Sequence, residues 1–289
     1  MTWVNTIIQG LFLGSLYALL ACGLSLLFGV MKVINLAHGD LGILGAFIAV
    51  TLIARGHLPM PLAIVLTLLI AAALGYLLQR GILSPALKSG ELSPLLATFG
   101  LAIVIQNGLL QTFSSNSHSI DTGWLETFAW RVSPELSIPA LSVATLLVAV
   151  VVLGGLHLML KRTKLGRAMR AASSDVDTAR LVGVDSQAVY AAASAIAIAT
   201  AALGGIFLAM RSSFDPSSGP TQLLFAFEAV VIGGLGSLWG TLIGGIVLGL
   251  AQTLGAQFDP AYSIVAGHLV FLAVLVFRPR GIYAVKGRA

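Results

Sequence analysis

The chain has 289 residues, of which 57% are apolar and only 9% are charged, and its mean hydropathy is +0.98. So few charged side chains cannot cover the water-exposed surface of a protein of this length, which excludes an ordinary soluble protein. The composition predicts a polytopic membrane protein. The net charge of +5 requires no nucleic acid partner, because anionic lipid head groups or a cytoplasmic subunit can meet the excess.

A membrane-spanning helix needs about 20 mostly apolar residues, because every backbone polar group must be satisfied within the hydrocarbon. This requirement predicts an all-α fold in a single domain, residues 1–289, with about eight or nine transmembrane helices and with broken or re-entrant segments. The seventh candidate segment is short. The candidates are residues 4–30, 36–54, 61–79, 94–113, 138–160, 188–210, 223–238, 241–258 and 261–277.

The first apolar run, residues 7–30, is longer than the core of a signal peptide, and no Lys or Arg precedes it. We therefore expect a membrane span that is retained in the protein. Cys22, the single cysteine, lies in this run and can form neither an internal disulfide nor, alone, a metal site. A small packing residue is the expected role.

A polar break follows the first segment, where Asn35, His38 and Asp40 lie around Gly39. One interpretation is a plain cytoplasmic turn, in which Asn35 or Asp40 caps a helix and Gly39 supplies flexibility. The other is the lining of a translocation pathway, because non-helical backbone at membrane depth is tolerated only where protein or a water-filled cavity satisfies it.

Two neighbouring amides, Gln106 and Asn107, lie in the middle of the fourth segment. They are candidates for the same pathway. Amide side chains within membrane spans more often join helices by hydrogen bonds, which is the alternative interpretation.

Residues 114–137 form the largest predicted external loop and contain Trp124, Phe128 and Trp130. Aromatic rings gather at the membrane interface, so these residues predict a short amphipathic piece that lies there. A docking surface is the alternative.

A dense group of Lys and Arg occupies residues 161–180, between two apolar segments. Clustered positive charge stays on the cytoplasmic side because its translocation is disfavoured. The loop 161–187 is therefore expected inside the cell, and alternating spans place the N-terminus outside and the C-terminus inside. Of the 16 Lys and Arg, this orientation leaves only Arg55, Arg131 and Arg211 outside.

Within this loop, residues 167–172 are predicted to form a short basic helix. Ser174 or Asp175 can cap a second helix that runs to Val182, and Gly183 suits its C-terminal turn. Two short helices would form a rigid docking surface. The alternative is a solvated loop that only maintains orientation, which needs positive charge but no particular order of residues.

Glu228 lies among apolar neighbours in residues 225–232, where burial of its charge would cost several kcal/mol. It must face a partner, a cavity or water, and it is a further candidate for the pathway. Contact with solute, pairing with a basic side chain and protonation remain open.

Small residues and a weak internal repeat indicate how the helices pack. Glycines four residues apart, at 10 and 14, 236 and 240, 240 and 244, and 245 and 249, let helix backbones approach closely, and the Ala-rich run 191–202 has the same effect.

Residues 28–32 and 207–211 share a similar pattern before a polar break. The predicted orientation places them on opposite sides of the membrane, as in the inverted repeats of transporters.

Segments 166–171 and 175–184 resemble the ATPase-docking loop of branched-chain amino acid ABC importer permeases. Residues 17–19, 29–40 and 228–245 resemble further motifs of this family, and the resemblance covers nearly the whole chain. Ser173 and Ser174 depart from it, at positions where relatives often carry acidic or larger residues.

The resemblance implies a bacterial inner-membrane permease subunit that is not itself an enzyme and has no cofactor or metal. Its implied partners are a similar second permease or a second copy, two cytoplasmic ATPases, an external substrate-binding protein and membrane lipid. The substrate would be a branched-chain or similar small apolar amino acid, although related permeases also move urea and short amides. The implied ATPase contacts are Gly166, Arg167, Arg170, Asp175, Asp177, Arg180 and Gly183.

The sequence has no G-x-x-x-x-G-K-[ST] phosphate-binding motif. Any nucleotide hydrolysis that drives transport must therefore take place on another polypeptide. An ion-coupled secondary transporter could instead use Glu228, Asp40 and His38 as a proton relay, but it would need no docking loop. An intramembrane hydrolase could pair Ser237 with His268. Gly-Ser pairs are common packing elements and an interior His is usually hydrogen-bonded, which argues against this hypothesis.

Overall fold

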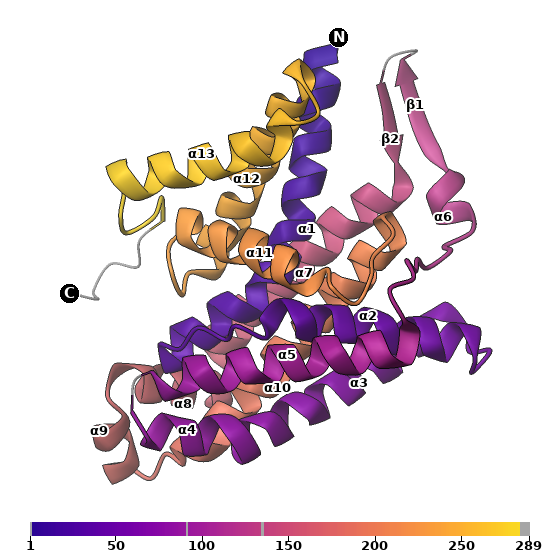
Figure 1. The fold of residues 1–289 in the computed structure, drawn as a ribbon. Helices are drawn as coiled ribbons and strands as arrows, with labels where there is room; N and C mark the ends of the chain where they lie inside the picture. Colours follow the sequence, from indigo (N-terminus) through magenta and orange to yellow (C-terminus); the bar gives the residue numbers. More distant parts are fainter. Residues whose placement is uncertain (1, 91, 134–135, 284–289) are drawn as a thin grey trace.

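The computed structural model describes residues 2–90, 92–133 and 136–283, and most of them are helical (Figure 1). Expected sites that fall at residues 134–135 or in the tail after Tyr283 lie outside the described residues. The elements are α1 (Thr2–Met31), α2 (His38–Ala54), α3 (Met60–Leu78), the π-helix η1 (Gln79–Leu83), α4 (Ser84–Lys88), α5 (Ser93–Phe113), α6 (Trp124–Thr127), β1 (Ala129–Ser133), β2 (Leu136–Pro139), α7 (Ala140–Arg162), α8 (Lys164–Ser174), α9 (Val176–Leu181), α10 (Ser186–Arg211), α11 (Gly219–Gly233), α12 (Leu238–Phe258) and α13 (Tyr262–Phe277).

Six helical stretches among the described residues are long and apolar enough to cross a membrane, which confirms a polytopic all-α protein. They are Trp3–Met31, Met60–Lys88, Ser93–Phe113, Ala140–Arg162, Ser186–Arg211 and Leu238–Phe258. The apolar helices α2, α11 and α13 have only 17, 15 and 16 residues. At about 1.5 Å per residue, these are shorter than the hydrocarbon core, which is about 30 Å thick.

The predicted seventh segment, residues 223–238, was wrong at both ends. Helix α11 begins four residues earlier at Gly219 and stops at Gly233. Gly234 and Gly236 then have φ angles of 109° and 79°. This left-handed backbone favours glycine and ends the helix, and α12 starts only at Leu238.

Two helices begin inside the bundle rather than at its ends. After α1, the chain turns at Lys32 (φ 56°) and returns to start α2 at His38, whose ring Nε2 lies 2.9 Å from the carbonyl oxygen of Leu20 in α1. After α10, the chain likewise returns to start α11 at Gly219, where a Cβ would collide with the side chain of Asp40. The N-terminal ends of α2 and α11 therefore meet, which confirms the predicted broken segments.

The helices around these two breaks pack in a related way. Helix α1 lies against α12 and α11, whereas α10 lies against α3 and α2. Gly23 of α1 approaches Ala197 of α10, and Gly204 of α10 approaches Leu20, so α1 and α10 cross antiparallel. This exchange of partners is the packing expected of the inverted repeat that the sequence pattern indicated.

Glycines bring α1 and α12 into backbone contact, as their spacing predicted. A Cβ at Gly14 would lie 2.5 Å from the carbonyl oxygen of Gly245, and a Cβ at Gly10 would lie 2.9 Å from Cα of Leu250. In lipid, the hydrophobic effect does not drive helices together. Close backbone approach stabilises the helix pair instead, because it increases van der Waals contact.

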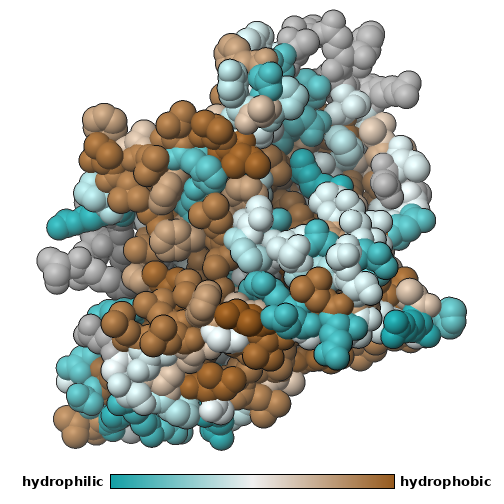
Figure 2. All heavy atoms as spheres, in the orientation of Figure 1, coloured by the Kyte–Doolittle hydropathy of each residue, from teal (hydrophilic) through white to brown (hydrophobic). Residues whose placement is uncertain are grey.

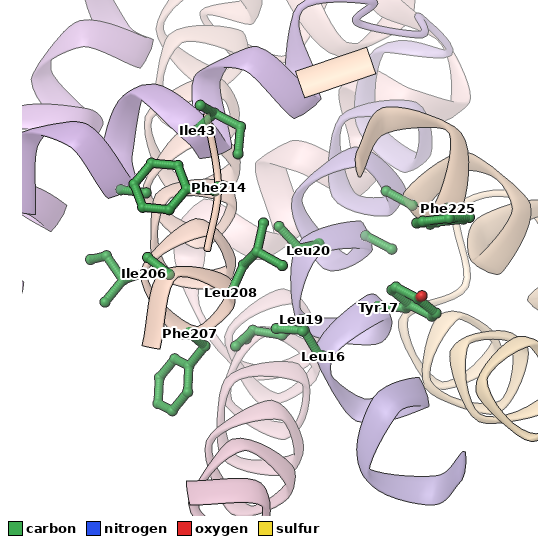
Figure 3. Close-up of a cluster of buried hydrophobic side chains, with 14 of the residues drawn as sticks. Leu16, Tyr17, Leu19, Leu20, Ile43, Ile206, Phe207, Leu208, Phe214 and Phe225 are labelled. Atoms are coloured by element: carbon green, nitrogen blue, oxygen red, sulfur yellow. The ribbon is translucent and has the colours of Figure 1, made fainter. Parts of the chain in front are cut away.

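The largest core cluster surrounds the middle of α1, with Leu16 and Leu20 of that helix beside Ile43 and Ile206 of two other helices (Figure 3). Cys22 is also fully buried, as expected.

On the outside, apolar side chains cover much of the face shown in Figure 2, and α3, α5, α7 and α13 expose large apolar residues. These exposed faces suit contact with lipid.

The region 114–137 contains the one-turn helix α6 and an antiparallel hairpin of β1 and β2, in which Trp130 pairs with Ile138. The sequence predicted an amphipathic piece here but not the hairpin, because the first half of β2 was assigned to the loop and the second half to the start of an apolar segment. The loop is anchored by a bridge from His118 to Phe214, after α10. We call this the hairpin end of the bundle and the opposite one, which carries α8 and α9, the α8 end.

Candidate translocation site and coupling surface

The turn before α2 is built by Asn35 and His38, both buried. Oδ1 of Asn35 accepts a hydrogen bond of 3.0 Å from the backbone N–H of Ala37, so this side chain organises the turn. The ring Nε2 of His38 donates to the carbonyl oxygen of Leu20, and its Nδ1 is buried without a partner among the described residues. Both side chains thus hold the broken backbone inside the bundle.

Asp40 lies at the meeting point of α2 and α11 and is 2% exposed. Its Oδ1 accepts a hydrogen bond of 2.9 Å from Nε2 of Gln106 on α5, so two of the predicted pathway residues are brought together. Asn107 is not brought to them. It is exposed, and its Nδ2 donates to the backbone oxygen of Ile103 in its own helix, 2.8 Å away.

Glu228 on α11 is 1% exposed and pairs with His268 on α13. The distance between Glu228 Oε1 and His268 Nδ1 is 2.5 Å. The second carboxylate oxygen, Oε2, is buried and has no hydrogen-bond partner among the described residues. The sequence left open whether Glu228 contacts solute, pairs with a basic side chain or is protonated. The structure supports a pairing, with His268, and leaves Oε2 as an unused acceptor.

Tyr17 and Gln252 complete this polar centre, which we define as Tyr17, Glu228, Gln252 and His268. The Tyr17 hydroxyl donates to Oε1 of Gln252 over 2.6 Å, and Nε2 of Gln252 is buried without a partner among the described residues. The ring of Phe225 lies 5.0 Å from that of Tyr17 and 6.5 Å from that of His268, which joins the two hydrogen-bonded pairs. The polar centre therefore holds one unused acceptor and one unused donor.

The sequence analysis missed Tyr17 and Gln252 as site residues. Gln252 carried the same signal as Gln106, an amide in the interior of an apolar helix. The glycine spacing of the same segment indicated helix packing and gave no sign of a polar site.

Ser237 has a structural role. Its hydroxyl oxygen accepts from the N–H of Gly240 over 3.1 Å and so caps α12. Since His268 Nδ1 bonds to Glu228, the two residues of the hydrolase hypothesis have separate partners. The described residues also contain no group of three or more His, Cys, Asp or Glu that could hold a metal.

Helix α8 folds back against the end of α7. The hydroxyl oxygen of Thr163 caps it by accepting from the N–H of Gly166, 3.0 Å away. A Cβ at Gly166 would lie 2.5 Å from Cα of Leu160, so only glycine allows this close approach. Met169 is buried on the same face, while Arg167 and Arg170 are exposed. The predicted basic helix is confirmed, and it starts three residues earlier than expected.

Helix α9 is capped by Asp175, as predicted. Its Oδ1 accepts from the N–H groups of Asp177 and Thr178 over 3.0 and 3.2 Å, and Oδ2 accepts from the Thr178 hydroxyl over 2.6 Å. These bonds, led by that from the Thr178 hydroxyl, hold the pKa of the Asp175 carboxyl below its usual value. The exposed pair of Arg180 and Asp177, 3.5 Å apart, adds little stability.

The tip of α9 presents apolar side chains to solvent. Leu181 and Val182 are 87% and 75% exposed. Gly183 follows with a φ of 85° and closes the helix through a bond from its N–H to the carbonyl oxygen of Arg180. Arg180 also donates through Nε to the hydroxyl of Ser186, which fastens α9 to the start of α10. The tip is therefore rigid and apolar.

Residues 6–277 match the family described as branched-chain amino acid transport system / permease component. The chain belongs to this family. As a permease of this family, it is similar to the high-affinity branched-chain amino acid transport system permease protein BraD of Pseudomonas aeruginosa, with 33% identity over 97% of this chain and 95% of the relative.

Two further relatives come from Escherichia coli K12. The permease protein LivH of a high-affinity branched-chain amino acid transport system is 29% identical over 97% of this chain and 95% of its own length. The permease protein LivM is 25% identical over 92% of this chain and 67% of its own length. No solved structure matches this permease.

Proposed function

We propose that this permease is the translocation subunit of an ATP-driven importer for branched-chain or similar small apolar amino acids in the bacterial inner membrane. The family match and the names of BraD and LivH support this assignment. The likeness to LivM as well as LivH supports pairing with a second, similar permease or a second copy. Two cytoplasmic ATPases and an external substrate-binding protein would complete the assembly.

The proposed orientation places the α8 end in the cytoplasm, with the N-terminus outside and the C-terminus inside. Lys161, Arg162, Lys164, Arg167 and Arg170 all lie at the α8 end. Clustered Lys and Arg next to a membrane span remain on the cytoplasmic side. Residues 114–137, with the hairpin, would then face outward toward the substrate-binding protein.

The loop 161–187 is the proposed ATPase-coupling surface. The side chains of Leu181 and Val182 suit insertion into a pocket of a partner, because buried apolar anchors dominate binding energy at interfaces. Arg167, Arg170 and Arg180 would attract acidic groups around that pocket. Asp175, Asp177, Gly166 and Gly183 would act indirectly, by fixing the two short helices to each other and to α7.

The polar centre is the proposed contact for solute. An amino acid carries an ammonium and a carboxylate, and the centre offers the unused acceptor Glu228 Oε2 and the unused donor Gln252 Nε2. This match between two orphaned groups and the two ends of an amino acid is the observation that carries the assignment. Urea is uncharged, so its N–H groups could donate to the Glu228 carboxylate but would not neutralise its charge.

The junction of α2 and α11 is proposed to line the same pathway and to move when access alternates. Hydrogen bonds of Asn35, His38 and Asp40 organise the turn before α2 and tie the start of α2 to α1 and, through Gln106, to α5. Asn107 is exposed, bonds to the backbone of its own helix and takes no part in this proposal.

Site-directed cross-linking tests the assignment. Cys22 would be replaced by Ala, and single cysteines would be placed at Val182 on the tip of α9 and at Phe128 near the hairpin, which is 45% exposed. We expect Val182→Cys to cross-link to a co-expressed ATPase, and Phe128→Cys to be labelled only from outside. External labelling of Val182→Cys, or its failure to cross-link with any ATPase in an active complex, would contradict the proposal.

A further inference from the structure

A cavity of about 790 Å³ lies at the α8 end and belongs neither to the polar centre nor to the tip of α9. Its walls come from the end of α1, the end of α7, the inner side of α8, the turn before α12 with the first residues of that helix, and residues 282–283 after α13. Among the residues that line it are Ser25, Lys161, Arg170 and Trp239. Helix α8 therefore forms part of the wall of a cavity as well as part of the coupling surface.

The charge in the lining is of one sign. Lys161 and Arg170 line the cavity, no Asp or Glu does, and neither cation has an acidic partner within the part of the chain that the structure describes. The hydroxyl of Ser25 is fully buried, has no hydrogen-bond partner among the described residues and lies in the lining. A buried hydroxyl without a partner is unfavourable, so this cavity suits a ligand with hydrogen-bonding oxygens.

Most of the remaining lining is apolar or aromatic, and it includes Leu26, Val30, Leu160 and Leu238. The ring of Trp239 lies 6.2 Å from that of His157, edge to face, and the pair joins α12 to α7. Trp is typical of the depth at which lipid head groups meet acyl chains. An amino acid is a poor fit, because its ammonium would meet cations and no carboxylate.

We propose that this cavity binds an anionic phospholipid, with the phosphate held by Arg170, Lys161 and Ser25 and the upper acyl chain against the apolar wall. Basic pockets between transmembrane helices on the cytoplasmic side bind the head groups of such lipids. A free phosphate ion would meet the two cations but leave the apolar wall uncovered. The bound lipid would fix α8 against α1 and α7, and so would stabilise the coupling surface.

Tryptophan fluorescence tests this proposal without any transport measurement, so its failure is distinct from failure of the proposed function. Trp3, Trp124 and Trp130 would be changed to Phe, which leaves Trp239 as the reporter. The full chain would be placed in nanodiscs that contain phosphatidylcholine and increasing amounts of brominated phosphatidylglycerol. We expect quenching at lower mole fractions than with brominated phosphatidylcholine.

The variant Arg170→Gln is expected to raise the mole fraction of brominated phosphatidylglycerol needed for half quenching by about fivefold, the effect of one cation near anionic lipid. Arg162→Gln is the matched control, because Arg162 is exposed beside Lys161 but does not line the cavity. Equal quenching by the two lipids, or equal effects of the two variants, would overturn the proposal. So would displacement of the brominated lipid by inorganic phosphate as readily as by unlabelled phosphatidylglycerol.

Discussion

Glu228 on α11 and His268 on α13 are joined by a hydrogen bond of 2.5 Å between Oε1 and Nδ1, inside a bundle of apolar helices. The bond leaves Oε2 of Glu228 without a partner among the described residues, and the amide nitrogen of Gln252 in the same polar centre is equally unused. A buried polar group is normally satisfied. We interpret the two exceptions as places for the ends of a solute.

The variant Glu228→Gln is expected to fold but to lower amino acid uptake by about tenfold or more, equivalent to about 1.4 kcal/mol, because an amide binds an ammonium less strongly than a carboxylate does. Glu228→Leu should also lower stability by about 1–3 kcal/mol, since His268 loses its partner. Uptake by proteoliposomes and thermal unfolding in detergent measure the two effects. Undiminished uptake by Glu228→Gln would remove this residue from the pathway.

Gln106 and its neighbour Asn107 form a matched pair on α5. Gln106→Leu takes away the hydrogen bond to Asp40 and leaves a buried carboxylate oxygen without a donor, which should lower stability by about 1–3 kcal/mol and impair uptake. Asn107→Leu alters only an exposed amide bonded to its own helix and should have little effect. Thermal unfolding and uptake of both variants check this contrast. A larger defect in Asn107→Leu would reverse our view of which amide faces the pathway.

Gly14→Leu should prevent assembly of the bundle, because the space at its Cβ is occupied by the backbone of α12. Overpacking usually costs about 1–3 kcal/mol, and a backbone contact cannot relax as a side chain can. Gly154 on α7 has open space around its Cβ, so Gly154→Leu is the control and should leave the protein folded. The amount of monodisperse protein after purification compares them. Equal amounts would show that the two helices can separate.

Asp175 should stabilise α9 through its cap, so Asp175→Ala should speed amide exchange at Asp177 and Thr178 and weaken ATPase binding. Asp175→Asn keeps a capping oxygen and should preserve both. Because the folded pKa of Asp175 lies below its ordinary value of about 3.9, the stabilisation is present at neutral pH. It is lost as the pH falls through the folded pKa.

Hydrogen exchange followed by mass spectrometry, corrected for the intrinsic effect of pH on exchange, measures this loss of protection. Asp175→Asn should show no such acid transition. If it responds to acid as the original chain does, another group controls α9.

Most of the fold could be predicted because apolar length and the Lys and Arg positions report directly on membrane spans. The basic loop was predicted in detail, since Asp175 and Gly183 are local signals for the start and end of a helix. The C-terminal end of α11 was not, because it depends on positive φ angles at Gly234 and Gly236 that only the packed structure reveals.

The candidate site was harder to predict, because its pairs come from distant parts of the chain. Asp40 and Gln106 were each chosen as polar residues in apolar surroundings, but nothing local indicated that they bond to each other. His268 was expected to be hydrogen-bonded in the interior, whereas its pairing with Glu228 depends on how α13 lies against α11. Sequence patterns identify unusual groups, and the tertiary contacts decide their partners.

Uptake of labelled leucine into proteoliposomes tests the central claim most directly, with this permease reconstituted together with its second permease, its ATPases and its binding protein. We predict uptake that requires both ATP and the ATPases, that persists when a protonophore collapses the proton gradient, and that fails when residues 161–187 are replaced by a flexible cationic linker of equal length. Uptake that continues without the ATPases and stops with the protonophore would contradict the account.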